Sequence, residues 1–108
     1  MRSAYKAMWL FIFFDLPTLS AEQRKFHTKF RKNLQKMGFM RAQLSVYINH
    51  FSSEEATLSI RKKIKNLLPA EGQVRILLVT DRQFGKMEIL DAKILLENET
   101  PLPQVLLF

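Results

Sequence analysis

Apolar runs alternate with stretches of mixed polarity along the chain and predict strands and helices in turn. Residues 8–14 form a continuous apolar run rich in aromatic side chains, which is typical of a central strand covered on at least one face. Apolar side chains at every second position predict another strand over residues 39–48. Further apolar runs predict a third strand at residues 74–80 and a short fourth strand at residues 86–90.

Two amphipathic helices are predicted between these strands. The first begins at Ser20, because Ser20 and Gln23 form a capping-box pattern, and Gly38 stands where a C-terminal cap is expected. The second begins after the serines at positions 52 and 53 and ends before Pro69, which cannot continue a helix. The apolar face of the first helix comprises Phe26, Phe30, Leu34 and Met37.

Written out, these elements follow the order β-α-β-α-β-β, in which the last strand can shift its pairing. We interpret this order as the split β-α-β arrangement of a ferredoxin-like α+β domain, β-α-β-β-α-β, with an extra C-terminal strand. In this fold two helices cover one face of a four-stranded sheet and leave the other face open. The alternation over residues 39–48 places Met40 and Leu44 towards the core, and it leaves Phe39 and Tyr47 on the other face. A second copy of the chain is the simplest cover for an open face, so we expect a symmetric homodimer.

We expect residues 1–92 to form the ferredoxin-like domain and residues 93–108 to form a C-terminal extension. Four apolar residues end this extension. A strand of that composition is expected to join a sheet edge, either in its own subunit or in the partner subunit. The four residues are Val105, Leu106, Leu107 and Phe108.

The chain carries 17 Lys and Arg residues against 10 Asp and Glu residues, a net charge of +7. Such an excess on a small domain indicates a polyanionic partner, with nucleic acid as the main candidate and a solvated basic surface as the alternative. Much of the excess lies on the first helix, where four lysines follow one stripe. The residues expected to contact nucleic acid are Arg24, Lys25, Lys29, Arg31, Lys32, Lys36 and Arg41.

Composition excludes several kinds of site. The chain has no cysteine, which excludes disulfides, zinc fingers and thiolate catalysis and fits a reducing compartment. Its three glycines are isolated from one another, which excludes a glycine-rich phosphate loop. The apolar run at residues 8–14 is far shorter than the roughly 20 residues that span a bilayer. We therefore expect a cytoplasmic protein that does not contact a membrane.

Asp15 is the main candidate for chemistry. It ends an otherwise apolar strand, where a carboxylate is costly unless it faces an opening. A capping or turn aspartate is the alternative interpretation. In a two-fold dimer, two copies of Asp15 could face each other and hold Mg²⁺ or Mn²⁺ together with water and a phosphate. Weaker candidates are Asp81, which follows the third strand, and the two histidines, His27 and His50.

An ordered set of motifs resembles one protein family. Residues 11–18, Phe-Ile-Phe-Phe-Asp-Leu-Pro-Thr, resemble the start of the second CRISPR-associated (Cas) protein, the small partner of the adaptation integrase. The basic first helix, residues 43–47, residues 74–77 and residues 84–88 resemble later parts of the same family in chain order. The Phe-Asp-Leu-Pro form of the first motif looks like the version found beside Cas9-type (type II) systems.

This resemblance implies properties beyond those predicted from the residues themselves. It implies a ferredoxin-like fold, a symmetric homodimer and a C-terminal strand that crosses to the partner subunit. It also implies that the dimer bridges two dimers of the CRISPR integrase, and that the assembly inserts short DNA duplexes into the CRISPR array. Family members are described as metal-dependent nucleases, in which the aspartate that matches Asp15 binds the metal.

Two functions of different classes fit these features. A DNA-binding scaffold would use the basic residues to neutralise the phosphates of double-stranded DNA without reading its bases. A metal-dependent endonuclease or endoribonuclease would use paired Asp15 to cleave DNA or RNA. A small-molecule regulatory domain and a toxin-like ribonuclease are further alternatives. Of these, the scaffold for spacer acquisition is the function that we expect.

Overall fold

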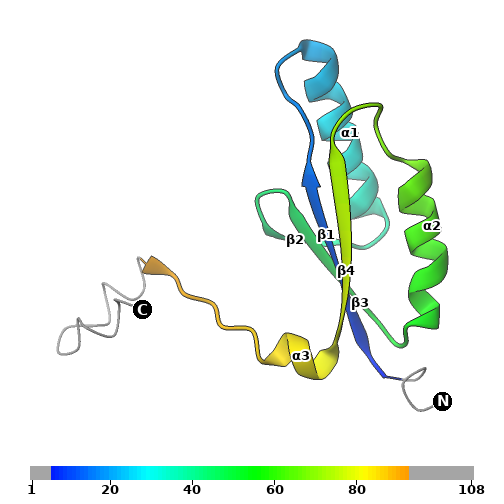
Figure 1. Cartoon of the computed structure of the whole chain (residues 1–108), viewed down its shortest axis with the longest axis vertical. Helices are drawn as coiled ribbons and strands as arrows, with labels where there is room; N and C mark the ends of the chain where they lie inside the picture. The colour runs from blue at the N-terminus through cyan, green and yellow to red at the C-terminus, as the bar shows by residue number, and fades with distance from the viewer. Residues whose placement is uncertain (1–5, 93–108) are drawn as a thin grey trace.

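The computed structural model describes residues 6–92, which contain the elements of one α+β domain. Its strands are β1 (Met8–Asp15), β2 (Met40–Gln43), β3 (Val46–Phe51) and β4 (Gln73–Thr80). Its helices are α1 (Ala21–Lys36), α2 (Leu58–Asn66) and α3 (Asp81–Gly85), and a short 3₁₀ helix, η2 (Glu55–Thr57), leads into α2. Figure 1 shows their arrangement.

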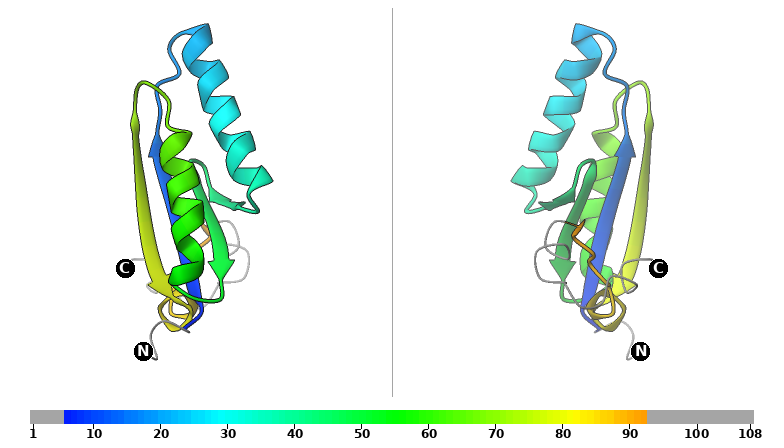
Figure 2. Two further views of the ribbon diagram at one scale, coloured as in Figure 1. Left: turned by 90° about the vertical axis from the view of Figure 1, so that its right-hand side faces the viewer. Right: turned by 90° about the vertical axis from the view of Figure 1, so that its left-hand side faces the viewer.

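The strands form one four-stranded antiparallel sheet in the order β2-β3-β1-β4. This is the strand order of a ferredoxin-like β-α-β-β-α-β fold, so the predicted fold class is confirmed. Helices α1 and α2 lie on the same side of the sheet, because Phe30 and Leu34 of α1 and Ile64 of α2 share one buried cluster with side chains of β1. The right-hand view of Figure 2 shows the other side, with the strands in front of α2. We call that uncovered side the open side of the sheet.

The side chains of β1 alternate between these two sides. Leu10, Ile12 and Phe14 are buried beneath the helices, whereas Phe11 and Phe13 lie half-buried on the open side. The central strand therefore supplies apolar side chains to both sides of the sheet. The buried core cluster comprises Leu10, Ile12, Phe14, Leu16, Phe30, Leu34, Phe39, Tyr47 and Ile64.

Helix α1 begins and ends as its sequence predicts. The Ser20 hydroxyl accepts a hydrogen bond from the Gln23 backbone N–H at 3.0 Å, and the Gln23 side chain accepts one from the Ser20 N–H at 3.0 Å. Gly38 has φ +96°, and the Phe39 N–H donates back to the Leu34 carbonyl, which terminates the helix in a Schellman motif. The predicted apolar face is narrower than expected, because Phe26 is 43% exposed.

The second predicted helix is divided into η2 and α2 and ends at Asn66, before Pro69. Ile64 is the buried residue of α2, whereas Leu67 and Leu68 lie beyond the helix and are partly exposed. Within residues 6–92, no helix combines the length and the apolar character that crossing a membrane requires.

The single strand predicted over residues 39–48 is in fact a hairpin. Leu44 and Ser45 form the turn between β2 and β3, and Gln43 pairs with Val46 across it. Ser45 adopts φ 64°, which reverses the chain direction. The apolar alternation runs on through the turn, so periodicity alone did not reveal it. Strand β3 also continues to Phe51, beyond the end that was predicted at residue 48.

The predicted orientation of this segment is also wrong. Phe39 and Tyr47 are buried in the core at 3% and 0% exposure, whereas Met40 and Leu44 are 60% and 79% exposed. Tyr47 pairs with Ile12, whose side chain faces the helices. Burying the two aromatic side chains removes more apolar area from water than burying Met and Leu, which favours the observed register. Phe39 and Tyr47 therefore do not belong to the open side.

The short fourth strand predicted at residues 86–90 is absent, because residues 87–91 have no regular structure. The segment between the third predicted strand and residue 86 forms α3, which Thr80 caps by accepting a hydrogen bond from the Gln83 N–H at 3.0 Å. After α3 the chain runs away from the helices (Figure 1). The predicted edge strand, Val105 to Phe108, lies outside the described residues, and the predicted domain boundary at residue 92 stays a prediction.

Candidate functional site

Asp15 is the last residue of β1, and its side chain is exposed. The alternation along the strand places it on the open side, in line with Phe11 and Phe13. Its partner across the sheet is Gln73, the first residue of β4. The carboxylate therefore meets solvent at one end of the open side and does not enter the core.

The turn between β2 and β3 holds the chain next to Asp15. The backbone N–H of Phe14 donates to the Ser45 carbonyl oxygen at 3.1 Å. In the two-residue turn that carries this acceptor, Ser45 takes a left-handed conformation, φ 64°, which costs a residue with a side chain about 1–2 kcal/mol. A strained turn beside an exposed carboxylate is a feature that recurs at functional sites.

The loop before β4 holds Asp15 from the other direction. Gly72 has φ +101°, and a Cβ atom there would lie 2.7 Å from Leu16 Cδ2 and 2.8 Å from the Asp15 carbonyl oxygen. Only glycine satisfies both the backbone conformation and this close approach. The backbone of Asp15 is thus held between the Ser45 turn and the Gly72 loop.

A hollow of about 390 Å³ opens beside the Asp15 carboxylate. Ser45 borders it on one side, and Gln73 and Arg75 border it on the other. The Arg75 Nε–H donates to Gln73 Oε1 at 3.0 Å. The hollow therefore combines a carboxylate, a hydroxyl, an amide and a guanidinium group. Its lining comprises Phe13, Phe14, Asp15, Leu44, Ser45, Val46, Gln73 and Arg75.

The chemistry of Asp15 suits a hard divalent cation, but one chain supplies too few ligands. Carboxylate oxygens are the donors that Mg²⁺ and Mn²⁺ prefer. Within residues 6–92, no group of three or more His, Cys, Asp or Glu side chains is placed to hold a metal ion. A cation at Asp15 would therefore need further ligands from a second subunit, from water or from a phosphate.

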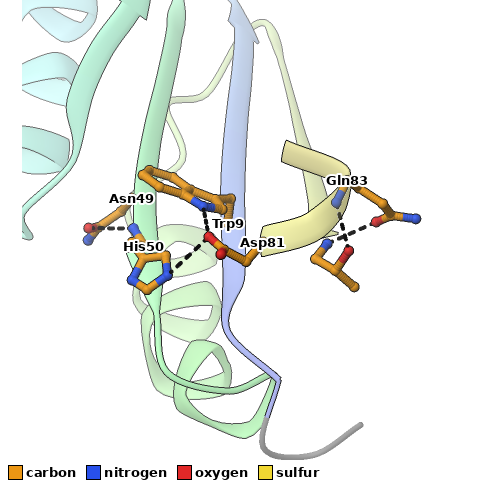
Figure 3. Close-up of polar contacts among 6 residues, drawn as sticks. Trp9, Asn49, His50, Asp81 and Gln83 are labelled. Atoms are coloured by element: carbon orange, nitrogen blue, oxygen red, sulfur yellow. Dashed lines mark hydrogen bonds and ion pairs between the residues drawn. The ribbon is translucent and has the colours of Figure 1, made fainter. Parts of the chain in front are cut away.

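Asp81 and His50, the weaker candidates, lie at the opposite end of the sheet from Asp15. The Trp9 indole Nε1–H donates to Asp81 Oδ1 at 2.8 Å, and His50 Nε2 lies 3.6 Å from the same oxygen, as Figure 3 shows. Since Met8 pairs with Thr80 and Asp15 pairs with Gln73, about seven residues of strand, roughly 20 Å, separate the two carboxylates. The sheet does not bring Asp81 into the Asp15 site.

His27 lies on α1 behind the Asp15 end of β1. Its ring meets the Phe14 ring edge-on, with 5.6 Å between centroids. Burial lowers the pKa of His27 below its ordinary value of 6.5, and the charge of Arg31 lowers it further. The imidazole packs against the core aromatic side chain that precedes Asp15, on the opposite side of the sheet from the carboxylate.

Most of the predicted nucleic-acid contacts meet in a shallow groove along the outer face of α1. Arg24 shares this groove with the lysine stripe, although its Nη1 also donates to the Thr18 and Leu19 carbonyl oxygens at 3.1 Å. Arg31 is half-buried outside the groove, and Arg41 lies on β2. The lysines in the groove are Lys25, Lys29, Lys32 and Lys36.

Comparison with known proteins assigns the family. The family model described as CRISPR associated protein Cas2 matches residues 8–87, from the start of β1 to just beyond α3. The chain belongs to the Cas2 family. The matched segment contains Asp15, the Ser45 turn and Arg75, and the family predicted from the motifs is confirmed. The type II version stays a prediction.

Three Cas2 relatives match most of the chain. The CRISPR-associated endoribonuclease Cas2 of Flavobacterium psychrophilum is 39% identical over 104 residues, which cover 96% of this chain and 90% of that protein. The protein of the same name from Parvibaculum lavamentivorans is 42% identical over 82 residues, 76% of this chain and 81% of that protein. The protein of the same name from Ligilactobacillus salivarius is 40% identical over 86 residues, which cover 80% of this chain and 85% of that protein.

Our sequence reasoning did not identify Ser45, Gly72 or Arg75 as residues of this Cas2 site. A signal for Arg75 was available, because it is the only charged residue in β4 and interrupts an apolar run, just as Asp15 is the only charged residue in β1 and ends its apolar run. Ser45 lies in the family motif at residues 43–47, but nothing there indicated that it would approach Asp15, and no local signal marked Gly72. Their role depends on loops that approach Asp15 only after the strands have paired.

Proposed function

We propose that this Cas2 chain is a metal-dependent endoribonuclease that acts as a homodimer in CRISPR adaptation. The observation that carries the proposal is the exposed Asp15 carboxylate in a hollow whose other polar groups suit a phosphate. The names of the three relatives described above, each a CRISPR-associated endoribonuclease, favour cleavage of RNA as the reaction.

The homodimer is supported by the apolar character of the open side. Leu77 and Met40 are 50% and 60% exposed there, and Phe11 and Phe13 are only half-buried. Apolar side chains on neighbouring strands form a continuous patch, which a soluble domain normally covers. A second copy presents the same patch and is the occupant we propose, with a two-fold axis near the Asp15 end of β1.

The proposed cofactor is Mg²⁺ or Mn²⁺, held between Asp15 of each subunit. A divalent ion at this position supplies charge neutralisation for a phosphodiester and lowers the pKa of bound water. The second subunit supplies the further carboxylate that a single chain lacks. The chain's own contribution is to fix the Asp15 backbone through the Phe14–Ser45 hydrogen bond and the tight Gly72 loop.

Cleavage assays on single-stranded RNA test this proposal. We expect the purified chain to cleave RNA with Mg²⁺ or Mn²⁺ and to stop when the metal is chelated, and we expect Asp15→Asn to be inactive. Glu88→Gln is the matched control, because Glu88 is an exposed carboxylate outside the hollow, and it should retain activity. Metal-dependent cleavage that persists in Asp15→Asn would exclude the proposed site.

A second function is favoured by the groove on α1. The four lysines and Arg24 line one face of the helix, where they can neutralise a phosphate backbone without reading bases. We propose that this face binds double-stranded DNA, and that the Cas2 dimer then serves as the scaffold between two dimers of the CRISPR integrase. The two functions use different surfaces of the chain, so variants at one surface leave the other available for measurement.

A further inference from the structure

Arg75 is the only charged residue of β4, and it lies on the open side where the apolar side chains give way to the hollow beside Asp15. It pairs with Phe13 in the sheet, and Asp15 pairs with Gln73, two residues away on β4. Arg75 and Asp15 are therefore diagonal neighbours on the same side of the sheet, which places their Cα atoms about 7–8 Å apart. An arginine side chain is long enough to bring its guanidinium beside the carboxylate.

A hydrogen bond sets the direction of the Arg75 side chain. Its Nε–H donates to Gln73 Oε1 at 3.0 Å, which turns the guanidinium along β4 towards the end of the sheet where Asp15 lies. Among the residues that the structure describes, the Nη groups of Arg75 donate no hydrogen bond, so their N–H donors are left for a ligand. Within residues 6–92, no carboxylate oxygen lies within 4.0 Å of the Arg75 guanidinium, whereas His50 and Asp81 do form such a pair at the other end of the sheet.

The surroundings of this guanidinium suit a phosphate. Its donors match two oxygens of a phosphate in a planar, bidentate arrangement, which a lysine cannot reproduce. Arg75 is exposed on the open side, between Phe13 on β1 and Leu77 further along β4, so a ligand can reach its guanidinium from solvent. The positive charge also offsets the repulsion between Asp15 and an incoming phosphate.

We propose that Arg75 binds a phosphate of the RNA backbone next to Asp15, with Gln73 as its positioning residue. The place of this phosphate beside a metal rests on the proposed nuclease function, but binding does not require cleavage. Arg75 therefore lies on a nucleic-acid contact separate from the basic groove on α1. In the proposed dimer, the two copies of Arg75 flank the pair of Asp15 carboxylates.

RNA binding in an Asp15→Asn background tests the proposal without interference from cleavage. Affinity for a short single-stranded RNA is measured against salt in Asp15→Asn, with Arg75→Gln, Arg75→Lys or Arg82→Gln added. We expect Arg75→Gln to weaken binding about tenfold or more and to reduce the log–log salt slope by about 0.7 for each phosphate that it leaves without a cation. Arg75→Lys should restore the slope and only part of the affinity.

Arg82→Gln is the matched control, because Arg82 is an exposed arginine on α3 outside the hollow. It should bind RNA as the Asp15→Asn parent does. Sedimentation of each variant gives the oligomeric state, which we expect to be unchanged by Arg75→Gln. Altered association would overturn the proposal, because it would assign Arg75 to a contact between subunits. Unchanged affinity and salt slope in Arg75→Gln would overturn it as well.

The outcomes for Arg75 and for the nuclease can be told apart. Loss of RNA binding in Arg75→Gln, together with no cleavage by the wild-type chain, would support Arg75 as a phosphate contact and contradict the nuclease. Asp15-dependent cleavage together with full binding by Arg75→Gln would support the nuclease and overturn the role of Arg75.

Discussion

The indole Nε1–H of Trp9 donates to Asp81 Oδ1 at 2.8 Å, and this bond ties the start of β1 to the first residue of α3. The Trp9 ring also stacks on Phe84, with 3.9 Å between ring centroids. A five-residue helix has little stability of its own, because nucleating a helix is costly. We infer that the contacts of Trp9 hold α3 against the sheet and thereby direct the chain that follows it.

Trp9→Phe should lower the free energy of unfolding by about 0.5–1.5 kcal/mol, because it removes the hydrogen bond and keeps an aromatic ring against Phe84. Trp9 is the only tryptophan, so the variant lacks the tryptophan fluorescence that would report unfolding. Urea denaturation of both proteins is therefore followed by circular dichroism. Asp81→Asn keeps an acceptor oxygen for the indole and should cost less. Equal stability of Trp9→Phe and the wild-type chain would show that the bond contributes nothing.

Gly72→Ala should destabilise the fold by about 2 kcal/mol. The added Cβ would require a left-handed backbone conformation and would approach Leu16 and the Asp15 carbonyl oxygen too closely. Gly85→Ala is the control, because a Cβ there meets nothing within 4 Å. Thermal denaturation compares the two variants, and similar melting temperatures would contradict the tight packing around Asp15.

Replacing Lys25, Lys29, Lys32 and Lys36 by Gln should weaken binding of duplex DNA and flatten its dependence on salt. The log–log slope should fall by about 0.9 for each phosphate that the variant no longer neutralises. The control replaces Lys62, Lys63 and Lys65, which are exposed on α2 outside the groove. If that control lowers the slope as much as the α1 variant, the DNA-binding surface is not confined to α1.

The free energy of unfolding should fall as the pH drops below about 6.5, in part because of His27. Its pKa is lowered in the folded chain by burial and by Arg31, so the unfolded chain takes up a proton at a higher pH. The folded state is therefore destabilised as the pH falls from 6.5 through the lowered pKa. His27→Gln should reduce this dependence. The free energy of unfolding is measured by urea denaturation between about pH 7.5 and pH 5, a range that brackets the ordinary pKa of histidine.

The control for the histidine experiment is Thr28→Ala, which changes the next residue of α1 and leaves His27 in place. It should show the same dependence on pH as the wild-type chain. A His27→Gln variant whose stability changes with pH as steeply as that of Thr28→Ala would assign the effect to other groups.

Leu77→Lys should convert the proposed homodimer into a monomer. Leu77 lies on the open side at 50% exposure, and a buried, unpaired ammonium group at a subunit contact is strongly unfavourable. Leu58→Lys is the control, since Leu58 is 52% exposed on α2 and lies away from the open side. Sedimentation equilibrium should give a monomer only for Leu77→Lys, and a monomeric wild-type chain would refute the dimer.

Patterns within short stretches of sequence correctly predicted the elements whose ends are set by residues close to one another along the chain. The capping box of Ser20 and Gln23, the cap at Gly38 and the apolar run of β1 all appear in the structure as the sequence predicts. The hairpin at Leu44 and Ser45 was missed because no glycine or proline marks the turn. The orientation of Tyr47 was missed because apolar side chains occupy both phases of the alternation.

The sequence by itself determined the family, the ferredoxin-like fold class and the position of Asp15 at the end of an apolar strand, because these depend on residue type and spacing. Only the tertiary structure decided which groups surround that carboxylate. Ser45 and Gly72 are 30 and 57 positions from Asp15 in sequence, and Arg75 is 60 positions away. Antiparallel pairing with β1 brings their strands and loops to the same end of the sheet, and local sequence patterns carry no information about that pairing.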